Sequence, residues 1–140
     1  MSNRFLLIIF SLSILCSCGD LKGGKKIKDG ISSGKAVIEL DSTVANYGTF
    51  PKSVGTISTS FHFTNTGDAD LVFLDVDYSC GCVLANYPLK PIKPGKNGEV
   101  IVSYRTQNKN PGEFVYKVYF AINGSPSNIV LEVRGNMTKN

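Results

Sequence analysis

Residues 57–68 read Ile-Ser-Thr-Ser-Phe-His-Phe-Thr-Asn-Thr-Gly-Asp, and this stretch decides the fold class. From 57 to 64, apolar or β-branched side chains alternate with small or polar ones, which is the period of two of a half-buried strand. The Asn-Thr-Gly-Asp that follows consists of turn-forming residues. We therefore expect Phe61 and Phe63 to face a core, His62 to face outward, and the chain to turn directly afterwards.

The same alternation returns along the rest of the body, with turn signals between the alternating segments. Among these signals are Pro94-Gly95, Asn97-Gly98 and Asn110-Pro111-Gly112. No stretch keeps the 3.6-residue period of a helix. About seven short strands within roughly 100 residues are typical of a sandwich, so we predict an all-β fold with one sandwich of about seven antiparallel strands. The segments expected to form strands are 36–40, 47–50, 57–64, 72–78, 100–104, 114–120 and 129–134.

The N-terminus has the features of an export signal. Arg4 supplies a positive charge, and the eleven residues from 5 to 15 are apolar except for two serines. As a helix this run would span about 16 Å, against about 30 Å for the hydrocarbon core of a bilayer. It is therefore too short to cross a membrane and fits the core of a signal peptide. We predict a lipoprotein signal peptide over residues 1–17.

Leu15-Cys16-Ser17-Cys18 resembles the bacterial lipobox, in which a leucine three positions before and a small residue directly before mark the modified cysteine. Cys18 meets both conditions, whereas Cys16 follows a large leucine. The resemblance implies a diacylglycerol in thioether linkage to Cys18, and several acyl chains together anchor a protein stably. An aspartate after the cysteine can hold such lipoproteins in the inner membrane. Gly19 stands there instead, which favours an outer-membrane protein that faces the periplasm.

Residues 18–35 combine the lipid-bearing cysteine with a stretch rich in glycine and lysine, which predicts a flexible tether. The folded domain is then expected over residues 36–138. The net charge of the chain is +4, but residues 36–140 hold nine Lys/Arg and nine Asp/Glu. A neutral body behind a basic leader is not typical of a nucleic-acid-binding protein, which gathers positive charge on its folded surface. The leader is expected to meet the membrane through its lipid anchor.

Cys80-Gly81-Cys82 carries the reactive side chains of the body. Residues i and i+2 of a strand face the same side, and Gly81 permits unusual backbone angles that would bring the two sulfurs together. A three-residue ring contributes only about 1.6 kcal/mol by chain entropy, against about 3 kcal/mol for a 15-residue loop. Three interpretations stay open: a local disulfide clamp or buried thiols, a redox couple, and a metal site. The feasible metal is Cu(I) on two thiolates, because tetrahedral zinc would need two more ligands.

Asp41-Ser42-Thr43 resembles the three-residue O-glycosylation motif of Bacteroides-type bacteria. It follows the first expected strand, where exposure to solvent is plausible. The resemblance makes Ser42 a predicted glycosylation site.

Several short motifs occur in the order Tyr47-Gly48-Thr49-Phe50, Phe61-His62-Phe63-Thr64-Asn65-Thr66-Gly67, Ser79-Cys80-Gly81-Cys82, Tyr87-Pro88, Pro91-Ile92-Lys93-Pro94-Gly95 and Leu131-Glu132-Val133-Arg134-Gly135. Together they resemble domain-of-unknown-function family 1573, which is common among lipoproteins of Bacteroides-type bacteria. The resemblance covers about residues 45–135, although the family usually has a threonine where this chain has Val83. It implies an immunoglobulin-like sandwich related to chaperone-type and cilia-associated β domains. It implies no established activity.

His62 is the only histidine of the chain. A multi-histidine metal site is thus excluded, and a Ser-His-Asp arrangement would have to use His62. No catalytic signature accompanies it, so we expect no enzyme and no cofactor. We expect a non-catalytic interaction module that binds another envelope protein or a glycan, because open sheet edges are templates for strand addition. The alternative is a thiol-redox or Cu(I)-binding function at Cys80 and Cys82.

Overall fold

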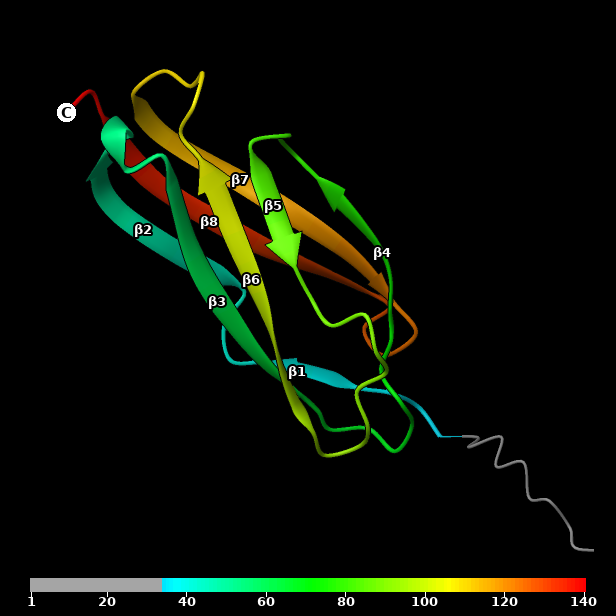
Figure 1. Cartoon of the computed structure of the whole chain (residues 1–140). Coiled ribbons are helices and arrows are strands. Elements are labelled where there is room, and N and C mark those ends of the chain that lie inside the picture. Colours follow the sequence, from blue (N-terminus) through cyan, green and yellow to red (C-terminus); the bar gives the residue numbers. More distant parts are fainter. Residues whose placement is uncertain (1–33) are drawn as a thin grey trace, which may run out of the picture. The chain divides into compact units, whose positions relative to one another are not determined.

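The computed structural model describes residues 34–140, which form two β-sheets packed face to face (Figure 1). Each sheet has four strands, and a single 3-10 turn, η1 (Lys52–Val54), interrupts the β structure. Within these residues no helix is long and apolar enough to cross a membrane. The strands are β1 (Ile38–Leu40), β2 (Val44–Pro51), β3 (Thr56–Asn65), β4 (Phe73–Tyr78), β5 (Val83–Asn86), β6 (Asn97–Arg105), β7 (Gly112–Ile122) and β8 (Asn128–Thr138).

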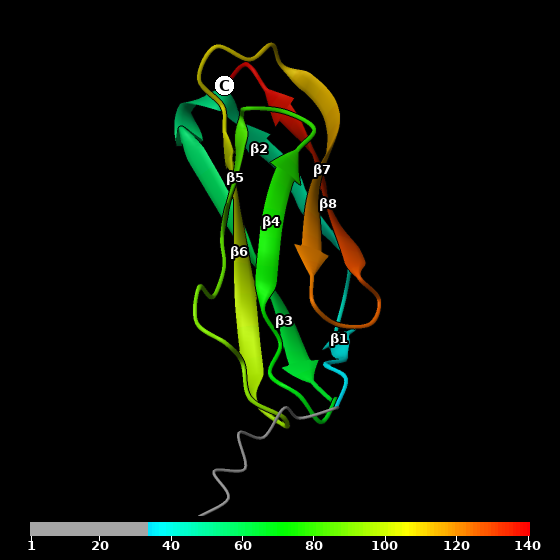
Figure 2. The ribbon, with the colours of Figure 1, turned by 90° about the vertical axis from the view of Figure 1, so that its right-hand side faces the viewer.

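The two sheets have the orders β1-β3-β6-β5 and β2-β8-β7-β4. Only the β5–β6 and β7–β8 connections stay within one sheet, and the five remaining connections pass from one sheet to the other. Strand β4 consequently lies between β5 and β7 when the sandwich is seen from its side (Figure 2). This is an immunoglobulin-like sandwich, as the sequence predicts.

The core between the sheets follows the predicted alternation. Phe61 and Phe63 are 2% and 1% exposed, while His62 between them is exposed. Gly98 in β6 is paired with Phe63 in β3, and a Cβ at this glycine would collide with the phenylalanine ring. The missing side chain therefore makes room for an aromatic ring. Further fully buried side chains come from both sheets: Val83, Val100, Val102, Tyr104, Val118, Phe120, Leu131 and Val133.

A tyrosine also links the two sheets through a polar contact. The Tyr47 hydroxyl in β2 donates a hydrogen bond of 2.8 Å to the carbonyl oxygen of Val102 in β6. Burial of the hydroxyl raises the pKa of Tyr47 from its ordinary value of 10 to about 12. The aromatic rings of Phe50 and Phe114 lie within 6.4 Å of the Tyr47 ring, centroid to centroid. Phe50 and Phe114 belong to the same sheet as Tyr47 and pack in turn on Tyr104 of β6, with centroids 6.3 and 4.3 Å apart, so ring packing and a hydrogen bond both connect the two sheets.

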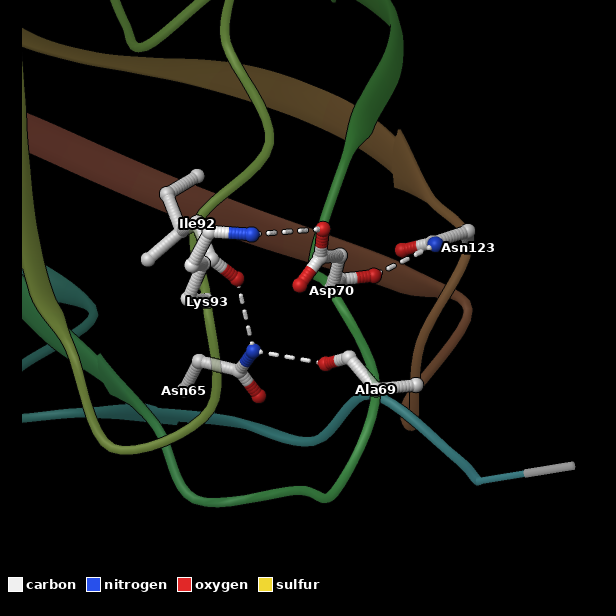
Figure 3. A network of polar contacts seen from close by, with 6 residues as sticks. All are labelled: Asn65, Ala69, Asp70, Ile92, Lys93 and Asn123. Carbon is white, nitrogen blue, oxygen red and sulfur yellow. Dashed lines mark hydrogen bonds and ion pairs between the residues drawn. The ribbon is translucent and has the colours of Figure 1, made fainter. Parts of the chain in front are cut away.

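One end of the sandwich is organised by the fully buried amide of Asn65 (Figure 3). Its Nδ2 donates hydrogen bonds of 2.8 Å to the carbonyl oxygens of Ala69 and Ile92. Its Oδ1 accepts hydrogen bonds from the backbone N–H groups of Val37 and Gly67. The amide therefore connects three separate chain segments with all of its donors satisfied, which marks it as a structural group.

Three details differ from the sequence-based expectation. There are eight strands, because β5 is too short to show an alternation. Strand β2 runs parallel to β8 rather than antiparallel. The alternation also breaks in β4: it predicts Leu74 on the same face as Val76, but the register shifts between Phe73 and Asp75. Phe73 consequently packs on the core and Leu74 is 63% exposed.

Candidate functional site

The segment from Ser79 to Cys82 crosses from one sheet to the other. At its start the Ser79 N–H donates to the carbonyl oxygen of Lys117 in β7, at 3.0 Å. At its end the carbonyl oxygen of Cys82 accepts from the N–H of Arg105, the last residue of β6, at 2.9 Å. The Cys-Gly-Cys motif therefore occupies the corner where the chain leaves β4 and enters β5.

Cys80 and Cys82 are joined by a disulfide at this corner, with Cα atoms 5.2 Å apart. The Val83 N–H donates to the carbonyl oxygen of Cys80 at 3.1 Å and closes a tight turn around the pair. Gly81 is not in the left-handed region, and a Cβ on it would meet nothing within 4 Å. Contrary to the expectation that Gly81 supplies unusual backbone angles, it does not use the left-handed φ that favours glycine.

Two basic residues surround the disulfide. The Lys109 Nζ lies 3.4 Å from the Cys80 Sγ, and the Cys82 N–H donates to the same sulfur at 3.1 Å. The Arg105 guanidinium donates to the carbonyl oxygen of Gly81 at 3.2 Å. A hollow of about 320 Å³ adjoins the pair. It is lined by Gly81, Cys82, Arg105, Gln107, Asn108 and Lys109.

The loop between β6 and β7 brings Lys109 to this position. The buried Thr106 anchors the loop, since its Oγ1 donates to the carbonyl oxygens of Lys52 and Gly55. The Lys109 N–H then donates to the carbonyl oxygen of Thr106 at 3.2 Å, and Asn108 adopts a φ of 57° to close this turn. Asparagine tolerates such a left-handed φ better than most residues. Sequence reasoning missed both basic residues, because 24 and 29 positions separate them from their partners at the motif.

The structure keeps His62 away from the cysteines. His62 is paired with Glu99, whereas Cys82 bonds to Arg105, six residues further along the same strand. At about 3.4 Å per residue this is a separation of about 20 Å. Among residues 34–140 no three His, Cys, Asp or Glu side chains are placed to hold a metal ion. As a disulfide, Cys80 and Cys82 offer no thiolates to copper, because metal binding requires the deprotonated thiols.

Some backbone groups on three of the four edge strands bond to local side chains. On β4, the Asp75 and Asp77 carboxylates accept the N–H groups of the residues that follow them, at 2.9 and 2.8 Å. On β5, the Ala85 N–H donates to the Tyr78 hydroxyl at 3.4 Å. On β2, the Asn46 side chain accepts the Gly48 N–H at 2.8 Å. These contacts occupy edge groups that an added strand would use, and they disfavour strand addition.

The Ser42 hydroxyl, at the predicted glycosylation site, belongs to the same group of local contacts. It donates to the carbonyl oxygen of Val44 at 2.9 Å and accepts the N–H of that residue at 3.2 Å. Ser42 is exposed, but a glycan on its oxygen would remove the donated hydrogen bond. Its glycosylation stays a prediction. Cys18, the predicted lipid-bearing residue, lies outside the described residues.

The outer surfaces of the two sheets differ in chemistry. On sheet β2-β8-β7-β4 the outward positions include large apolar side chains, and we call this surface the β7–β8 face. Tyr119 and Val130 are directly opposite each other on β7 and β8. Large apolar side chains on the three strands of this sheet other than β4 are 40–56% exposed: Val44, Val115, Tyr119 and Val130. Two shallow hollows of about 430 and 260 Å³ lie on the same sheet.

The outer surface of sheet β1-β3-β6-β5 is mostly hydroxylic, and we call it the hydroxyl face. The Ser58 and Ser103 hydroxyls share a hydrogen bond of 2.8 Å, and the Thr64 Oγ1 donates to Asn97 Oδ1 at 3.0 Å. Leu84 on the edge strand β5 is its large exposed apolar side chain. The remaining outward positions of β3 include Ser60 and His62.

Comparison with solved structures identifies the fold in proteins of different kinds. A protein of unknown function from Porphyromonas gingivalis W83 matches 72% of this chain with a TM-score of 0.63 and 19% identity. The chain spans 46% of that protein. The ASH/PapD-like domain 7 of human CEP192 matches 76% of the chain, with a TM-score of 0.59, 8% identity and 88% of its own length covered.

A family 123 glycoside hydrolase from Clostridium perfringens also matches 76% of the chain, with a TM-score of 0.57 and 8% identity over 28% of its length. At these identities the likeness shows the fold alone, and one fold supports many functions. No curated protein matches the chain. The family model of DUF1573, described as a protein of unknown function, matches residues 38–137, which span seven of the eight strands completely and nearly all of β8. This chain therefore belongs to the DUF1573 family.

Proposed function

We propose that the chain is a non-catalytic interaction module of the bacterial envelope that docks a partner protein on the β7–β8 face. The observation that carries the proposal is the set of large apolar side chains on this face, 40–56% exposed in each case. Tyr119 and Val130 form an exposed apolar pair across two strands, and exposed apolar patches are typical of interaction sites. The hydroxyl face of the same sandwich serves as the internal comparison.

The pattern along β7 supports the same proposal. A strand with one solvated face alternates apolar and polar residues, whereas a strand covered on both faces is apolar throughout. In β7 the inward Val118 and Phe120 are buried, and the outward Val115 and Tyr119 are also large and apolar. The charged Glu113 and Lys117 lie on the same outward side, so the outer side of β7 is apolar only at Val115 and Tyr119. These two positions are the ones that a docked partner would cover.

The chemistry of the face favours a protein over a glycan. Val44, Val115 and Val130 are branched aliphatic side chains, which pack well against other aliphatic groups. Charged residues lie among them: the Lys117–Glu132 ion pair separates Val115 from the Tyr119–Val130 pair. Arg134 lines the larger hollow, and Asp75 and Asp77 line the smaller one. Aliphatic side chains interspersed with charges of both signs suit a protein partner of complementary charge. The capped sheet edges make docking on the face the better mode than strand addition.

We also propose that the domain reaches its partner as a lipoprotein of the outer membrane, anchored at Cys18 and facing the periplasm. The lipobox-like sequence and the glycine after Cys18 support this placement. Cys18→Ala is expected to leave the protein unprocessed or to release it from membranes, while Cys16→Ala is expected to remain membrane-bound. Intact mass of the native protein provides the check. An unmodified Cys18 in that spectrum would reject the anchor.

Site-specific photo-crosslinking in living cells tests the docking face. A photoreactive phenylalanine analogue is placed at position 115 on the β7–β8 face, or at position 60 on the hydroxyl face as the matched control. We expect one discrete adduct from position 115 that protease digests, and none from position 60. Equal adducts at both positions, or no adduct at 115, would contradict the proposal. An adduct that is removed by glycosidases and not by protease would replace the protein partner with a glycan.

A further inference from the structure

We propose that the Cys80–Cys82 disulfide is a thiol-oxidising centre that takes two electrons from an acidic dithiol, with Cys80 as the sulfur that is attacked. The proposal goes beyond docking on the β7–β8 face and rests on different residues. Three observations carry it: the unequal exposure of the two cysteines, the positive charge beside Cys80, and the small size of the ring.

The two sulfurs are not equivalent. Cys82 is 6% exposed and packs in the core, whereas Cys80 is half-buried. An incoming thiolate reaches the more accessible sulfur, since access decides which sulfur of a disulfide is attacked. The structure therefore assigns Cys80 to the mixed disulfide with substrate and Cys82 to the departing thiolate.

The surroundings of Cys80 stabilise its reduced form. The Lys109 ammonium lies 3.4 Å from the Cys80 Sγ, and the Cys82 N–H points at the same sulfur from 3.1 Å. A cation and an N–H donor both favour a thiolate over a thiol. A disulfide whose reduced form is stabilised is a stronger oxidant. Neither contact is needed to hold the disulfide closed, since the covalent bond does that.

The ring offers little to oppose reduction. It spans three residues, so its chain-entropy contribution is small, and closing a short loop stabilises a fold far less than closing a long one. The corner also has independent support, because the Ser79 and Cys82 backbone groups are already tied to β7 and β6. The pair can therefore open without the loss of either strand ladder.

The reaction balances without another reactant. A substrate thiolate attacks the Cys80 sulfur, forms the substrate–Cys80 disulfide and releases the Cys82 thiolate, which takes up a proton. The second substrate thiol, as its thiolate, attacks the substrate sulfur of this mixed disulfide and releases the Cys80 thiolate. The substrate dithiol has lost two electrons to become a disulfide, and the Cys80–Cys82 disulfide has gained them to become two reduced cysteines.

The hollow beside the pair would set the charge of the substrate. Cys82 lines it and Cys80 does not, but the lining Lys109 reaches to within 3.4 Å of the Cys80 Sγ. Arg105 and Lys109 are its charged residues, and no acidic side chain takes part in the lining. The Arg105 side chain is exposed and its charge is available to a bound group. We therefore assign to this site a dithiol that carries carboxylates next to its cysteines.

Redox equilibration of the full-length chain, purified in detergent, against glutathione buffers tests the centre. Alkylation of free thiols, read by mass, measures the reduced fraction. We expect Lys109→Met to lower the equilibrium constant for reduction about tenfold, which is about 30 mV for two electrons. Lys109→Arg is expected to keep the wild-type value, and so is Lys90→Met, an exposed lysine in the β5–β6 connection. A pair that stays oxidised in excess reduced glutathione, or a Lys109→Met variant with the wild-type constant, would overturn the proposal.

A second experiment tests the substrate class. Reduced synthetic peptides with two cysteines, flanked by either glutamates or lysines, are mixed with the oxidised full-length chain in a single turnover. We expect the glutamate peptide to be oxidised at least severalfold faster, and added salt to reduce the difference because it screens Arg105 and Lys109. Equal rates for the two peptides would reject the acidic substrate, and no oxidation of either peptide would reject the centre itself.

Discussion

The two outer surfaces of this sandwich cover the same core but carry different chemistry. The hydroxyl face has serines paired across strands, such as Ser58 with Ser103, and satisfies its hydroxyls within the sheet. The β7–β8 face instead exposes Val115, Tyr119 and Val130 on its two central strands. Both surfaces can be covered by water. A complex with a partner would gain about 25 cal/mol for each Å² of apolar surface that it removes from water, and the β7–β8 face offers more such surface than the hydroxyl face.

The comparison shows that the outward positions of a strand, and not the inward ones, carry information about function. Inward positions are apolar in both sheets, because both must fill one core, and they carry no information about partners. Outward positions are free to be polar, as Ser60 and His62 are on β3. Large apolar residues at the outward positions of β7 and β8 therefore require a reason other than folding, and a docked protein supplies one.

The largest expected effect tests whether the hydroxyl face is truly the outer side of β3. Phe63→Ala removes a ring that is 1% exposed and in edge-to-face contact with Phe73, at 5.6 Å between centroids. We expect it to lower the free energy of unfolding by about 3–5 kcal/mol. Ser60→Ala, on the outward side of the same strand, is expected to change it by less than about 0.5 kcal/mol. Chemical denaturation measures both, and similar losses would break the inward–outward assignment.

The next effect concerns the end of the sandwich that Asn65 organises. Asn65→Ala removes the side-chain partner of the Ala69 carbonyl and of the Val37 and Gly67 N–H groups, while the Ile92 carbonyl keeps the Leu71 N–H as a donor. We expect a loss of about 2–3 kcal/mol. Asn86→Ala, an exposed asparagine on β5, is the control and is expected to be near neutral. If the Asn65 variant unfolds at the same denaturant concentration as the control, the amide is not the structural connection described here.

A smaller effect sharpens the comparison by testing the link between the two sheets. Burial raises the pKa of Tyr47 to about 12, so the folded state holds this proton more tightly than the unfolded state, where the pKa is about 10. The corresponding stability is complete below pH 10 and is lost as the pH rises from 10 to 12. This contribution to stability is smaller than the pKa shift alone implies, because the Tyr47 hydroxyl is only partly buried and solvent screens it. We expect Tyr47→Phe to remove this loss of stability. Urea unfolding at pH 9 and pH 11 measures it. If the variant keeps the pH dependence of the wild type, another group causes the loss.

The smallest expected effect on stability falls on the β7–β8 face itself. Val115→Ser combined with Val130→Ser should change the free energy of unfolding by less than about 1 kcal/mol, because both side chains are about half exposed and lie outside the core. With the photoreactive residue moved to position 119 on the same face, this pair of substitutions is expected to abolish the crosslinked adduct. A large loss of stability instead would mean that these valines serve the fold, and the reason to propose a partner would disappear.

Sequence alone predicts the sandwich because side-chain alternation reflects which residues face the core. Phe61, Phe63 and Val100 follow this rule without exception. It fails at Leu74, where a register shift in β4 exchanges inward and outward positions, and a bulge leaves no mark in the alternation itself. It also misses β5, whose four residues pair with β6 through long-range contacts rather than through a local pattern.

The sequence predicts the Cys80–Cys82 pair but not the basic residues that lie beside it. The spacing of Cys80 and Cys82 is enough to suggest the pair, because two residues of an extended chain that are two apart face the same side. Lys109 reaches the pair only through the turn closed by Asn108 and the anchor at Thr106. These contacts depend on how the β6–β7 loop packs against η1, which no local pattern of residues indicates.

Hydroxyl-radical footprinting compares the two faces most directly. It is carried out on the protein in native membranes and again after purification, with oxidation read at Tyr119 on the β7–β8 face and at His62 on the hydroxyl face. If a partner covers the β7–β8 face, oxidation of Tyr119 should be severalfold lower in membranes than in the purified chain, while oxidation of His62 should be the same in both. Equal oxidation of Tyr119 in the two samples, or protection of His62 instead, would contradict the account.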